Sequence, residues 1–178
     1  GSMNTMWQYL ANQKGFKYVM REVPLPIVSA EQFIESFWQG VTPNTKVIFI
    51  SHIPSPTAII FPVKEICARA RKAVILTVVD GAHVPGQLPL DLEDIGADFY
   101  SGNLHKWVCS PKGSAFLYAR KEVFPMLEPL ILTAMWKLDR PADSSPLDMM
   151  EYIGTRDPAA FLAIPDAIRF LEENHWDV

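Results

Sequence analysis

The 178-residue sequence predicts an α/β fold in which a mainly parallel sheet is flanked by helices. Short continuous apolar runs, typical of strands buried on both faces, alternate with segments whose apolar residues recur at helical spacing. Polar residues follow directly after three of the apolar runs. In parallel sheets, ligands bind beyond the carboxyl ends of the strands. The pattern that predicts the fold therefore also predicts where a site lies.

The amino-terminal residues are expected to form a helix and then a strand. Residues 1–3 resemble the remnant of an expression tag and are set apart from the fold. Residues 3–14 have apolar residues at helical spacing, and Gly15 ends that pattern. Residues 16–23 have strand character and stop at prolines. The helix residues expected to point inward are Met6, Tyr9 and Leu10.

Two helices and a buried strand are expected next. Ser29 and Gln32 form a capping-box pattern that opens the first of these helices. Residues 46–50 are a continuous apolar run, as expected for a strand buried on both faces. Residues 62–72 show helical spacing again. The apolar faces of the two helices are Phe33, Ile34, Phe37 and Trp38, and Val63, Ile66, Cys67 and Ala70.

The remaining chain is expected to add further strands and a final helix. Residues 139–148 are rich in Pro, Asp and Ser and indicate an exposed crossing loop. Asp157 is expected to cap a helix with Pro158 at its first position. That helix runs to about Asn174 and is kinked or restarted at Pro165. The further strands are expected at residues 73–79, 97–100 and 114–118.

Composition argues against several classes of protein. Hydrophobic residues make up 49% and charged residues 20%, which is typical of a soluble globular domain. The net charge of −4 is spread without long runs, so no nucleic-acid partner is expected, and no apolar run reaches the ~18 residues of a membrane span. Cys67 and Cys109 lack metal-ligand spacing, so we expect no metal and reduced thiols in a cytoplasmic protein. A nucleotide-binding domain would need a glycine-rich turn after a strand, and none is present.

The most informative residues are Asp80 and Lys106, which follow neighbouring apolar runs. Asp80 begins the motif Asp80-Gly-Ala-His83, and Lys106 ends the stretch Ser-Gly-Asn-Leu-His-Lys. A carboxylate at the end of a buried strand needs a cation or hydrogen-bond donors, and a protonated pyridine nitrogen meets that need. A lysine beside large apolar residues becomes a usable amine nucleophile. Together they predict a site that holds a pyridinium cofactor as a Schiff base.

Each residue of this set also has a simpler interpretation. Lys106 alone is most often a hydrated surface lysine, and only the surrounding motif reverses that preference. Asp80 alone fits a turn equally well, because Asp-Gly favours turns. His83 suits stacking on a ring or bonding to its phenolic oxygen, or it is a loop histidine bonded to the backbone. Asn103 and His105 alternate on one side of an extended segment, which suits them to bind a phosphate or to cap the loop.

Two further segments are weaker candidates. Ser55 stands in a loop that Pro54 and Pro56 stiffen, which either preorganises a site or reflects ordinary turn chemistry. Thr155 follows Gly154 near a helix start, where backbone donors and a hydroxyl suit an anion. A plain helix cap explains Thr155 at least as well.

These motifs resemble the class V aminotransferase family of pyridoxal-phosphate enzymes, which have the fold-type-I architecture, and within it the isopenicillin-N-epimerase-like branch. The resemblance implies that the chain is a central fragment of the large domain. Residues 4–140 would form a partial cofactor-binding domain, and residues 141–178 a crossing loop and helix toward a small domain. The parts it would lack include a phosphate-binding helix and a carboxylate-binding arginine. The matching stretches are residues 50–57, 79–83, 97–107, 111–113 and 152–157.

The resemblance implies roles by position. Lys106 would form the Schiff base with pyridoxal 5'-phosphate, and Asp80 would pair with the pyridine nitrogen. His83 would contact the ring or its oxygen. Asn103 and His105 would bind the phosphate.

Two positions concern the phenolic oxygen and a second subunit. Ser55 occupies the place where desulfurase relatives carry an asparagine near the phenolic oxygen. Thr155 matches the residue that reaches a partner subunit's phosphate in dimers of the family. We therefore expect a homodimer with a shared cofactor site, and an incomplete sheet edge favours association in the same way.

The implied function is a pyridoxal-phosphate-dependent enzyme that acts on the Cα of an amino acid, with Lys106 as general base and acid. Epimerisation, transamination and loss of a side-chain substituent all remain open. Cys109 lies three residues from Lys106 and is badly placed as the mobile cysteine of a desulfurase, so that reaction ranks below an epimerase-like or lyase reaction. The alternative is a catalytically incompetent fragment or pseudoenzyme that serves as a structural or interaction module.

Overall fold

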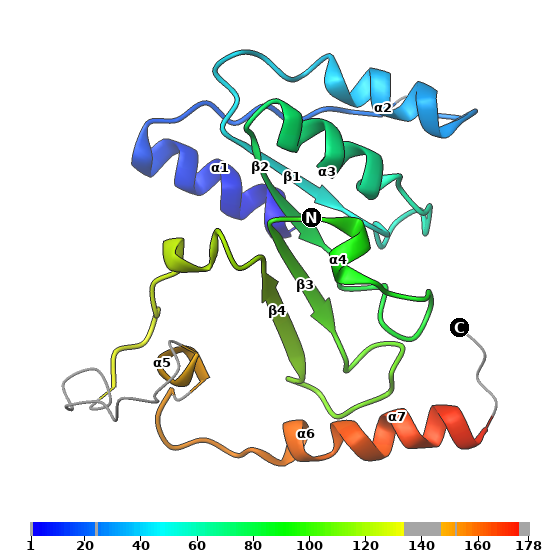
Figure 1. The fold of residues 1–178 in the computed structure, drawn as a ribbon, viewed down its shortest axis with the longest axis vertical. Coiled ribbons are helices and arrows are strands. Elements are labelled where there is room, and N and C mark those ends of the chain that lie inside the picture. Colours follow the sequence, from blue (N-terminus) through cyan, green and yellow to red (C-terminus); the bar gives the residue numbers. More distant parts are fainter. Residues whose placement is uncertain (1, 24, 134–146, 152, 175–178) are drawn as a thin grey trace.

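A four-stranded sheet with neighbours in the order β1-β2-β3-β4 forms the centre of the protein (Figure 1). The structure is a computed structural model that describes residues 2–23, 25–133, 147–151 and 153–174. β1 pairs with β2 and β2 with β3 in parallel, whereas β3 and β4 are antiparallel. The expected mainly parallel sheet is thus confirmed. The strands are β1 (Val47–Ser51), β2 (Leu76–Asp80), β3 (Phe99–Asn103) and β4 (Ala115–Ala119).

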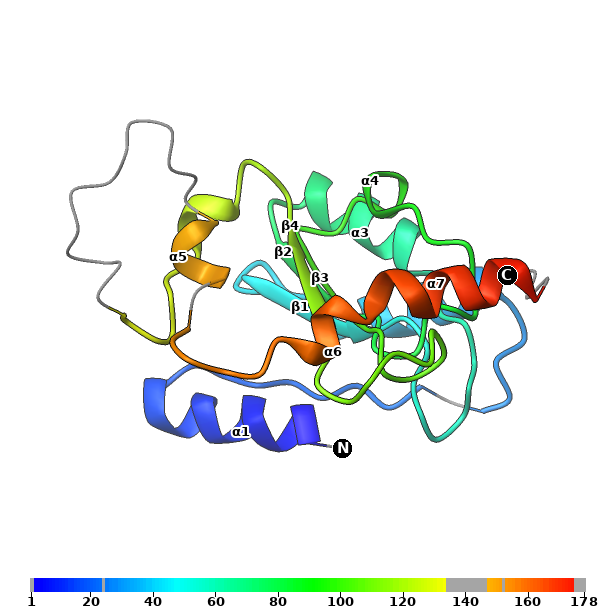
Figure 2. The ribbon, with the colours of Figure 1, turned by 90° about the horizontal axis from the view of Figure 1, so that it is seen from below.

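Helices cover both faces of this sheet. Figures 1 and 2 show α3 and α4 on one face and α1 on the other, while α6 and α7 lie beyond the end of β3. A short 3-10 turn, η1, follows β4. The helical elements are α1 (Ser2–Lys14), α2 (Ala30–Trp38), α3 (Val63–Lys72), α4 (Leu92–Ile95), η1 (Phe124–Met126), α5 (Asp148–Glu151), α6 (Ala159–Leu162) and α7 (Ile164–Glu173).

The starts and apolar faces of α2 and α3 agree with the sequence pattern. Ser29 Oγ accepts a hydrogen bond of 3.1 Å from the backbone N–H of Gln32, which caps α2. The Gln32 side chain in turn accepts one of 2.9 Å from the N–H of Val28. All four expected apolar residues of α3 are buried. The core of the domain consists of Phe33, Ile48, Ile50, Val63, Ile66, Cys67, Ala70, Ile75, Val79, Ala97 and Tyr100.

The inward face of α1 differs from the expected one. Met6 and Tyr9 are exposed, whereas Ala11 is buried and Leu10 is half-buried. The Trp7 ring lies 5.9 Å from the ring of Phe49 in β1. The expectation was wrong for Met6 and Tyr9 because the helix packs on the sheet through its large aromatic residue and the small residue one turn later.

Residues 16–23 do not form the expected strand. They make no backbone–backbone hydrogen bond with any described residue. Side chains hold the segment instead: Tyr18 donates to Asn4 Oδ1 at 3.1 Å, and Arg21 donates to the backbone oxygen of Ser36 at 3.2 Å. A strand exists only where a neighbouring backbone pairs with it, and β1 pairs with β2 alone. The residue types were compatible with a strand, but the partner is missing.

The strand expected over residues 73–79 begins later, at Leu76. Ala73 and Val74 still belong to the turn that ends α3, with hydrogen bonds to Arg69 and Arg71 respectively. Val74 has a φ of 57° and is exposed. The chain must reverse between helix and strand, and this reversal uses the first apolar residues of the run.

The carboxyl-terminal helix is divided where its proline predicted a kink or restart. Asp157 Oδ1 accepts a hydrogen bond of 2.9 Å from Ala159 N–H at the start of α6, with Pro158 at the cap position. α7 then begins at Ile164 with Pro165 in its first turn. Of the crossing loop expected over residues 139–148, residues 139–146 lie outside the described residues, and Asp148 begins α5.

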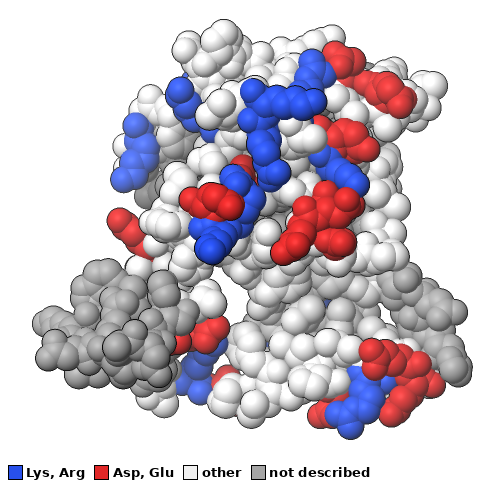
Figure 3. All heavy atoms as spheres, in the orientation of Figure 1, with Lys and Arg blue, Asp and Glu red and all other residues white. Residues whose placement is uncertain are grey.

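Charged side chains of both signs are intermixed on the face that Figure 3 shows. Lys64 of α3 pairs with Asp94 of α4 at 2.5 Å. Arg71 of α3 donates to the backbone oxygen of Gly96 at 2.6 Å. These two contacts fasten α3 to α4 and to the glycine that follows it.

Candidate functional site

The carboxyl ends of the three parallel strands lie side by side. Ser51 of β1 is in register with Asp80 of β2, and Asp80 is in register with Ser101 of β3. His52 continues this alignment, because its N–H donates to the backbone oxygen of Asp80 at 2.8 Å. The polar residues that end these strands therefore share one edge of the sheet, where parallel sheets bind ligands.

Asp80 leads into a tight turn at this edge. One of its carboxylate oxygens accepts a hydrogen bond of 3.0 Å from the N–H of Ala82, and the other bonds to no described residue. A Cβ on Gly81 would lie 2.1 Å from the Tyr100 ring, so only glycine fits there. The half-buried carboxylate is thus held in place with one oxygen available for a ligand.

His83 and Lys106 meet beside this turn. The Lys106 Nζ atom lies 2.9 Å from His83 Nε2. On the opposite side of the same imidazole, the indole N–H of Trp107 donates to His83 Nδ1 at 3.3 Å. The pKa of His83 is lowered by burial and by the positive charge of Lys106, which together outweigh the opposing effect of Asp80. The structure therefore brings together Lys106 and the Asp80 turn, as the sequence predicts.

A buried tyrosine supports the turn from below. The Tyr100 hydroxyl lies 3.0 Å from His52 Nδ1, and the two rings meet edge to face. Burial lowers the pKa of His52, while burial and the charge of Asp80 raise the pKa of Tyr100. The sequence did not single out Tyr100, because its place in an apolar run looks like that of any core residue.

Asn103 and His105 lie where β3 ends. Asn103 is the last residue of the strand and is half-buried. His105 donates its Nδ1–H to the backbone oxygen of Ser114 at 2.9 Å. This bond fixes the imidazole and leaves Nε2 as the ring nitrogen available to a ligand.

Ser55 and Thr155 make no hydrogen bond to Lys106 among the described residues. Ser55 is exposed in the loop that follows β1, and Thr155 is exposed between α5 and α6. The loop of Ser55 turns at Pro54, whose backbone oxygen accepts from Thr57 and Ala58. Neither residue belongs to the hydrogen-bonded group of His83, Lys106 and Trp107 in the described part of the chain.

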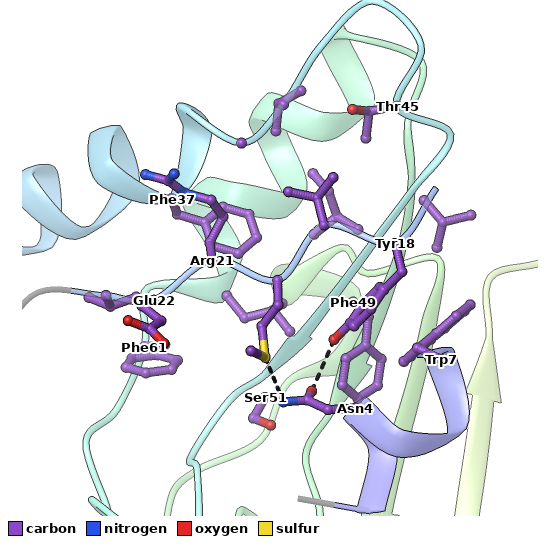
Figure 4. A pocket seen from close by; sticks show the side chains of 18 of the residues that line it. Asn4, Trp7, Tyr18, Arg21, Glu22, Phe37, Thr45, Phe49, Ser51 and Phe61 are labelled. Atoms are coloured by element: carbon purple, nitrogen blue, oxygen red, sulfur yellow. Dashed lines mark hydrogen bonds between the residues drawn. The ribbon is translucent and has the colours of Figure 1, made fainter. Parts of the chain in front are cut away.

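A large hollow lies along the outer edge of β1. It has a volume of about 1150 Å³ and is bounded by α1, residues 16–23 and β1 (Figure 4). Leu76 N–H bonds to Lys46 and His52 N–H to Asp80, so the even-numbered residues of this segment face β2. The outer backbone groups of β1, at Val47, Phe49 and Ser51, consequently face the hollow, and no described backbone pairs with them. This is an open sheet edge and lies apart from Lys106.

The described residues offer no group of three or more His, Cys, Asp or Glu side chains suited to a metal ion. The same residues contain no helix that is long and apolar enough to cross a membrane.

The mainly parallel sheet with helices on both faces is the architecture of the fold-type-I class. The model of the family described as "Aminotransferase class-V" matches residues 2–177. The chain therefore belongs to the class-V aminotransferase family, whose members use pyridoxal 5'-phosphate. The resemblance of the motifs to this family is confirmed.

The relatives with curated names include isopenicillin N epimerases and L-cysteine desulfhydrases. An isopenicillin N epimerase from Streptomyces clavuligerus is 36% identical over 96% of this chain and 46% of its own length. The putative L-cysteine desulfhydrase 1 from Oryza sativa subsp. japonica is 35% identical over 84% of this chain and 32% of its own length. The chain thus spans less than half the length of these curated relatives.

Solved structures agree in fold. The apo cysteine desulfurase from Thermococcus onnurineus superposes with a TM-score of 0.75 at 25% identity, covering 96% of this chain and 42% of that one. A complex of the cystine C-S lyase C-DES with cysteine persulfide gives a TM-score of 0.79 at 23% identity, covering 95% and 46%. The latter likeness concerns the fold alone.

Proposed function

We propose that the protein is a pyridoxal-phosphate-dependent enzyme that acts on the Cα of an amino acid, with Lys106 as the residue that holds the cofactor. The observation that carries this proposal is the placement of the Lys106 amine, 2.9 Å from His83 and beside the Asp80 turn. A lysine, a carboxylate and an imidazole at the carboxyl edge of a parallel sheet are the groups that such a cofactor needs.

The residues present fit this cofactor. Asp80 has one oxygen without a partner among the described residues, which suits it to accept a hydrogen bond from a protonated ring nitrogen. His83 is suited to contact the ring or its phenolic oxygen. Asn103 and His105 each have a polar atom available at the end of β3, and we assign them to the phosphate.

Pyridoxal phosphate, when bound, supplies an electron sink for reactions at Cα. Asp80 would keep a proton on the ring nitrogen, because a carboxylate at hydrogen-bond distance stabilises the cationic ring. Lys106, once its amine is released, would take the Cα proton as general base and return it as general acid. The same residue thus serves first to hold the cofactor and then to move the proton.

The reaction we favour is epimerisation or a lyase reaction. The named relatives include an isopenicillin N epimerase and a cysteine desulfhydrase, and both reactions begin with loss of the Cα proton. Cys109 is exposed, and its thiol lies 3.7 Å from the backbone oxygen of Trp107 on the segment that carries Lys106. That short tether makes Cys109 a poor mobile nucleophile, so a desulfurase reaction ranks lower.

The cofactor proposal is tested by the absorbance of the full-length protein after addition of pyridoxal phosphate. We expect a band near the visible edge that borohydride abolishes. Lys106→Ala should lack this band, whereas Lys112→Ala, which removes an exposed lysine six residues away, should keep it. A full-length protein without such a band would support the alternative of a pseudoenzyme that serves as an interaction module.

The reaction type needs a second measurement. The full-length protein, loaded with cofactor, would be incubated with candidate amino acids in deuterated water. Exchange of the Cα proton with inversion and without cleavage supports an epimerase, whereas release of sulfide from cysteine supports a lyase. Formation of a keto acid with retention of the amino group on the cofactor would point to transamination instead.

We further propose a homodimer whose cofactor sites are shared. Thr155 is exposed, and the edge of β1 is open to a partner. Mixed dimers test this directly, because a Lys106→Ala chain still carries Thr155 and a Thr155→Asp chain still carries Lys106. If sites are shared, the mixture regains cofactor binding that both parents lack. A monomer in light scattering, or a mixture no better than its parents, would contradict the shared site.

A further inference from the structure

The loop of residues 81–87, which carries His83, is anchored at both ends. At its start, the N–H of Gly81 donates to the backbone oxygen of Ser101 in β3 at 2.8 Å. At its end, Gln87 Nε2 donates to the His83 carbonyl at 2.5 Å. The position of the His83 imidazole therefore follows that of the loop as a whole.

Gly86 is the point at which this loop meets the segment that carries Lys106. A Cβ at Gly86 would lie 2.6 Å from the carbonyl carbon of Trp107, 2.7 Å from its oxygen and 2.8 Å from the nitrogen of Val108. All three are backbone atoms, so rotation of a side chain cannot make room. Gly86 also has a φ of 83°, a conformation that residues with a Cβ rarely adopt. The close approach and the backbone conformation thus both require glycine.

The segment on the other side of this contact is fixed as well. The N–H of Ser110 donates to the backbone oxygen of Leu104 at 3.1 Å, which closes the chain around Lys106 into a turn. A larger residue at position 86 must therefore displace either this turn or the loop of residues 81–87. Either displacement changes the distance between His83 and Lys106, which is 2.9 Å between their nitrogen atoms.

We propose that Gly86 is a positioning residue, which lets the two loops meet backbone to backbone and so sets the separation of the ring-binding side chains from the Lys106 amine. This inference rests on the proposed function, in which Asp80 and His83 contact the ring of pyridoxal phosphate and Lys106 attacks its aldehyde. The Lys106 nitrogen bonds to the aldehyde carbon, and the aldehyde oxygen leaves as water with two of the lysine protons. Because one reactant is held by each loop, the distance between the loops sets the distance between the reacting groups.

Gly86→Ala in the full-length protein tests this role. A methyl carbon 2.6 Å from the carbonyl carbon of Trp107 needs about 1 Å more room, because carbon atoms pack at ~3.5–4.0 Å. A misplacement of this size lowers reaction rates by up to about 100-fold. We expect the reaction of Lys106 with pyridoxal phosphate, followed by absorbance, to slow roughly 10- to 100-fold.

Gly15→Ala is the matched control. Gly15 ends α1 with a φ of 74°, and no described atom lies within 4 Å of a Cβ built there. This variant carries the strain of the same backbone conformation without a close contact. Its rate of reaction with pyridoxal phosphate should equal that of the wild type.

The second readout needs no cofactor. The pKa of His83 is lowered by burial and by the positive charge of Lys106, against the opposing effect of Asp80. Separation of the loops weakens both lowering effects, so in Gly86→Ala this pKa should rise toward its ordinary value of 6.5, whereas Gly15→Ala should keep the wild-type pKa. An NMR titration of the imidazole signals measures the change, with His83→Gln to identify those of His83. A loss of stability alone would not move this pKa.

Gln87→Ala is the second variant, for the case that Gly86→Ala does not fold. It removes the hydrogen bond to the His83 carbonyl and lets the same loop move without adding an atom to the contact. Loss of one hydrogen bond should raise the pKa of His83 and slow the reaction of Lys106 about fivefold. If both values stay at those of the wild type, the position of the loop does not control the reaction and the role of Gly86 is overturned.

The outcomes separate the two proposals. If the wild type forms no borohydride-stable adduct on Lys106, the proposed function fails, while the pKa of His83 in Gly86→Ala still reports the contact between the loops. If the adduct forms in the wild type and Gly86→Ala matches Gly15→Ala in both rate and pKa, the role of Gly86 is overturned and the cofactor site stands.

Discussion

Tyr100 fills the space beneath the Asp80–Gly81 turn, and its hydroxyl lies 3.0 Å from Nδ1 of His52. Three strands thus contribute to one support: His52 follows β1, Asp80 ends β2 and Tyr100 lies within β3. Because Gly81 has no side chain, the phenol can pack directly against its backbone. The position of the Asp80 carboxylate is therefore set by contacts that the strands make with one another.

Replacement of Asp80 by Asn should weaken the chemistry more than the binding of cofactor. The amide keeps the shape but removes the charge that we expect to stabilise a protonated ring nitrogen. Loss of a charge-assisted hydrogen bond of this kind should lower the rate of Cα proton exchange roughly 10- to 100-fold. Asp94→Asn is the control, since Asp94 pairs with Lys64 on the surface. An Asp80→Asn protein that exchanges at the wild-type rate would show that Asp80 does not face the ring.

The burial of His52 predicts a pH dependence of stability. Its pKa is lowered in the folded protein from an ordinary value of 6.5, so below that pH the unfolded chain binds a proton that the folded chain does not. His52 therefore lowers the free energy of unfolding as the pH falls through this range. Urea unfolding of the wild type and His52→Gln at pH values on both sides of it provides the measurement. The stability of the wild type relative to the variant should decrease with falling pH, and a constant difference would refute the prediction.

Among the elements, β2 and β3 are joined at the end opposite the site by a buried carboxylate. One oxygen of Asp98 accepts from both the N–H and the hydroxyl of Thr77, at 2.8 and 3.0 Å. Its other oxygen accepts from two nitrogens of Arg120, at 3.1 and 2.7 Å. The connection fixes the register of β2 against β3, and thus the distance between Asp80 and the segment that carries Lys106.

Asp98→Asn should destabilise the fold because its amide group would face donors. The free energy of unfolding should fall by about 1–3 kcal/mol, the cost of leaving buried donors without acceptors. Asp94→Asn, which removes a carboxylate from an exposed ion pair, should change it by less than about 0.5 kcal/mol. Equal effects of the two substitutions in urea unfolding would contradict the structural role of Asp98.

Elements that the sequence predicts well are those whose pattern reflects burial. The apolar runs at residues 46–50 and 97–100 became β1 and β3, and the apolar face of α3 is buried as expected. Residues 16–23 have the residue types of a strand, yet no neighbouring backbone pairs with them. Pairing depends on other parts of the chain and leaves no local signal.

The candidate site likewise contains residues that the sequence could reveal and residues that it could not. Asp80, His83 and Lys106 could be found because each follows an apolar run that ends at the same sheet edge. Tyr100 and Trp107 could not, since only the folded chain shows their contacts with His52 and His83.

At the scale of the whole molecule, the parallel strands bring Asp80, His83 and Lys106 to one edge, while Ser55 and Thr155 are exposed loop residues. In the homodimer that we propose, these three residues would contact the cofactor from one chain, and Thr155 would reach the phosphate in the partner subunit. The open edge of β1 beside α1 is our candidate surface for that association (Figure 4).

The most direct test maps the covalent attachment of the cofactor. The full-length protein would be incubated with pyridoxal phosphate, reduced with borohydride, digested and analysed by mass spectrometry. We predict a single modified peptide that contains Lys106, and no modification in Lys106→Ala. A label on another lysine such as Lys17 or Lys112, with Lys106 unmodified, would contradict the central claim that the edge formed by β1, β2 and β3 is the cofactor site.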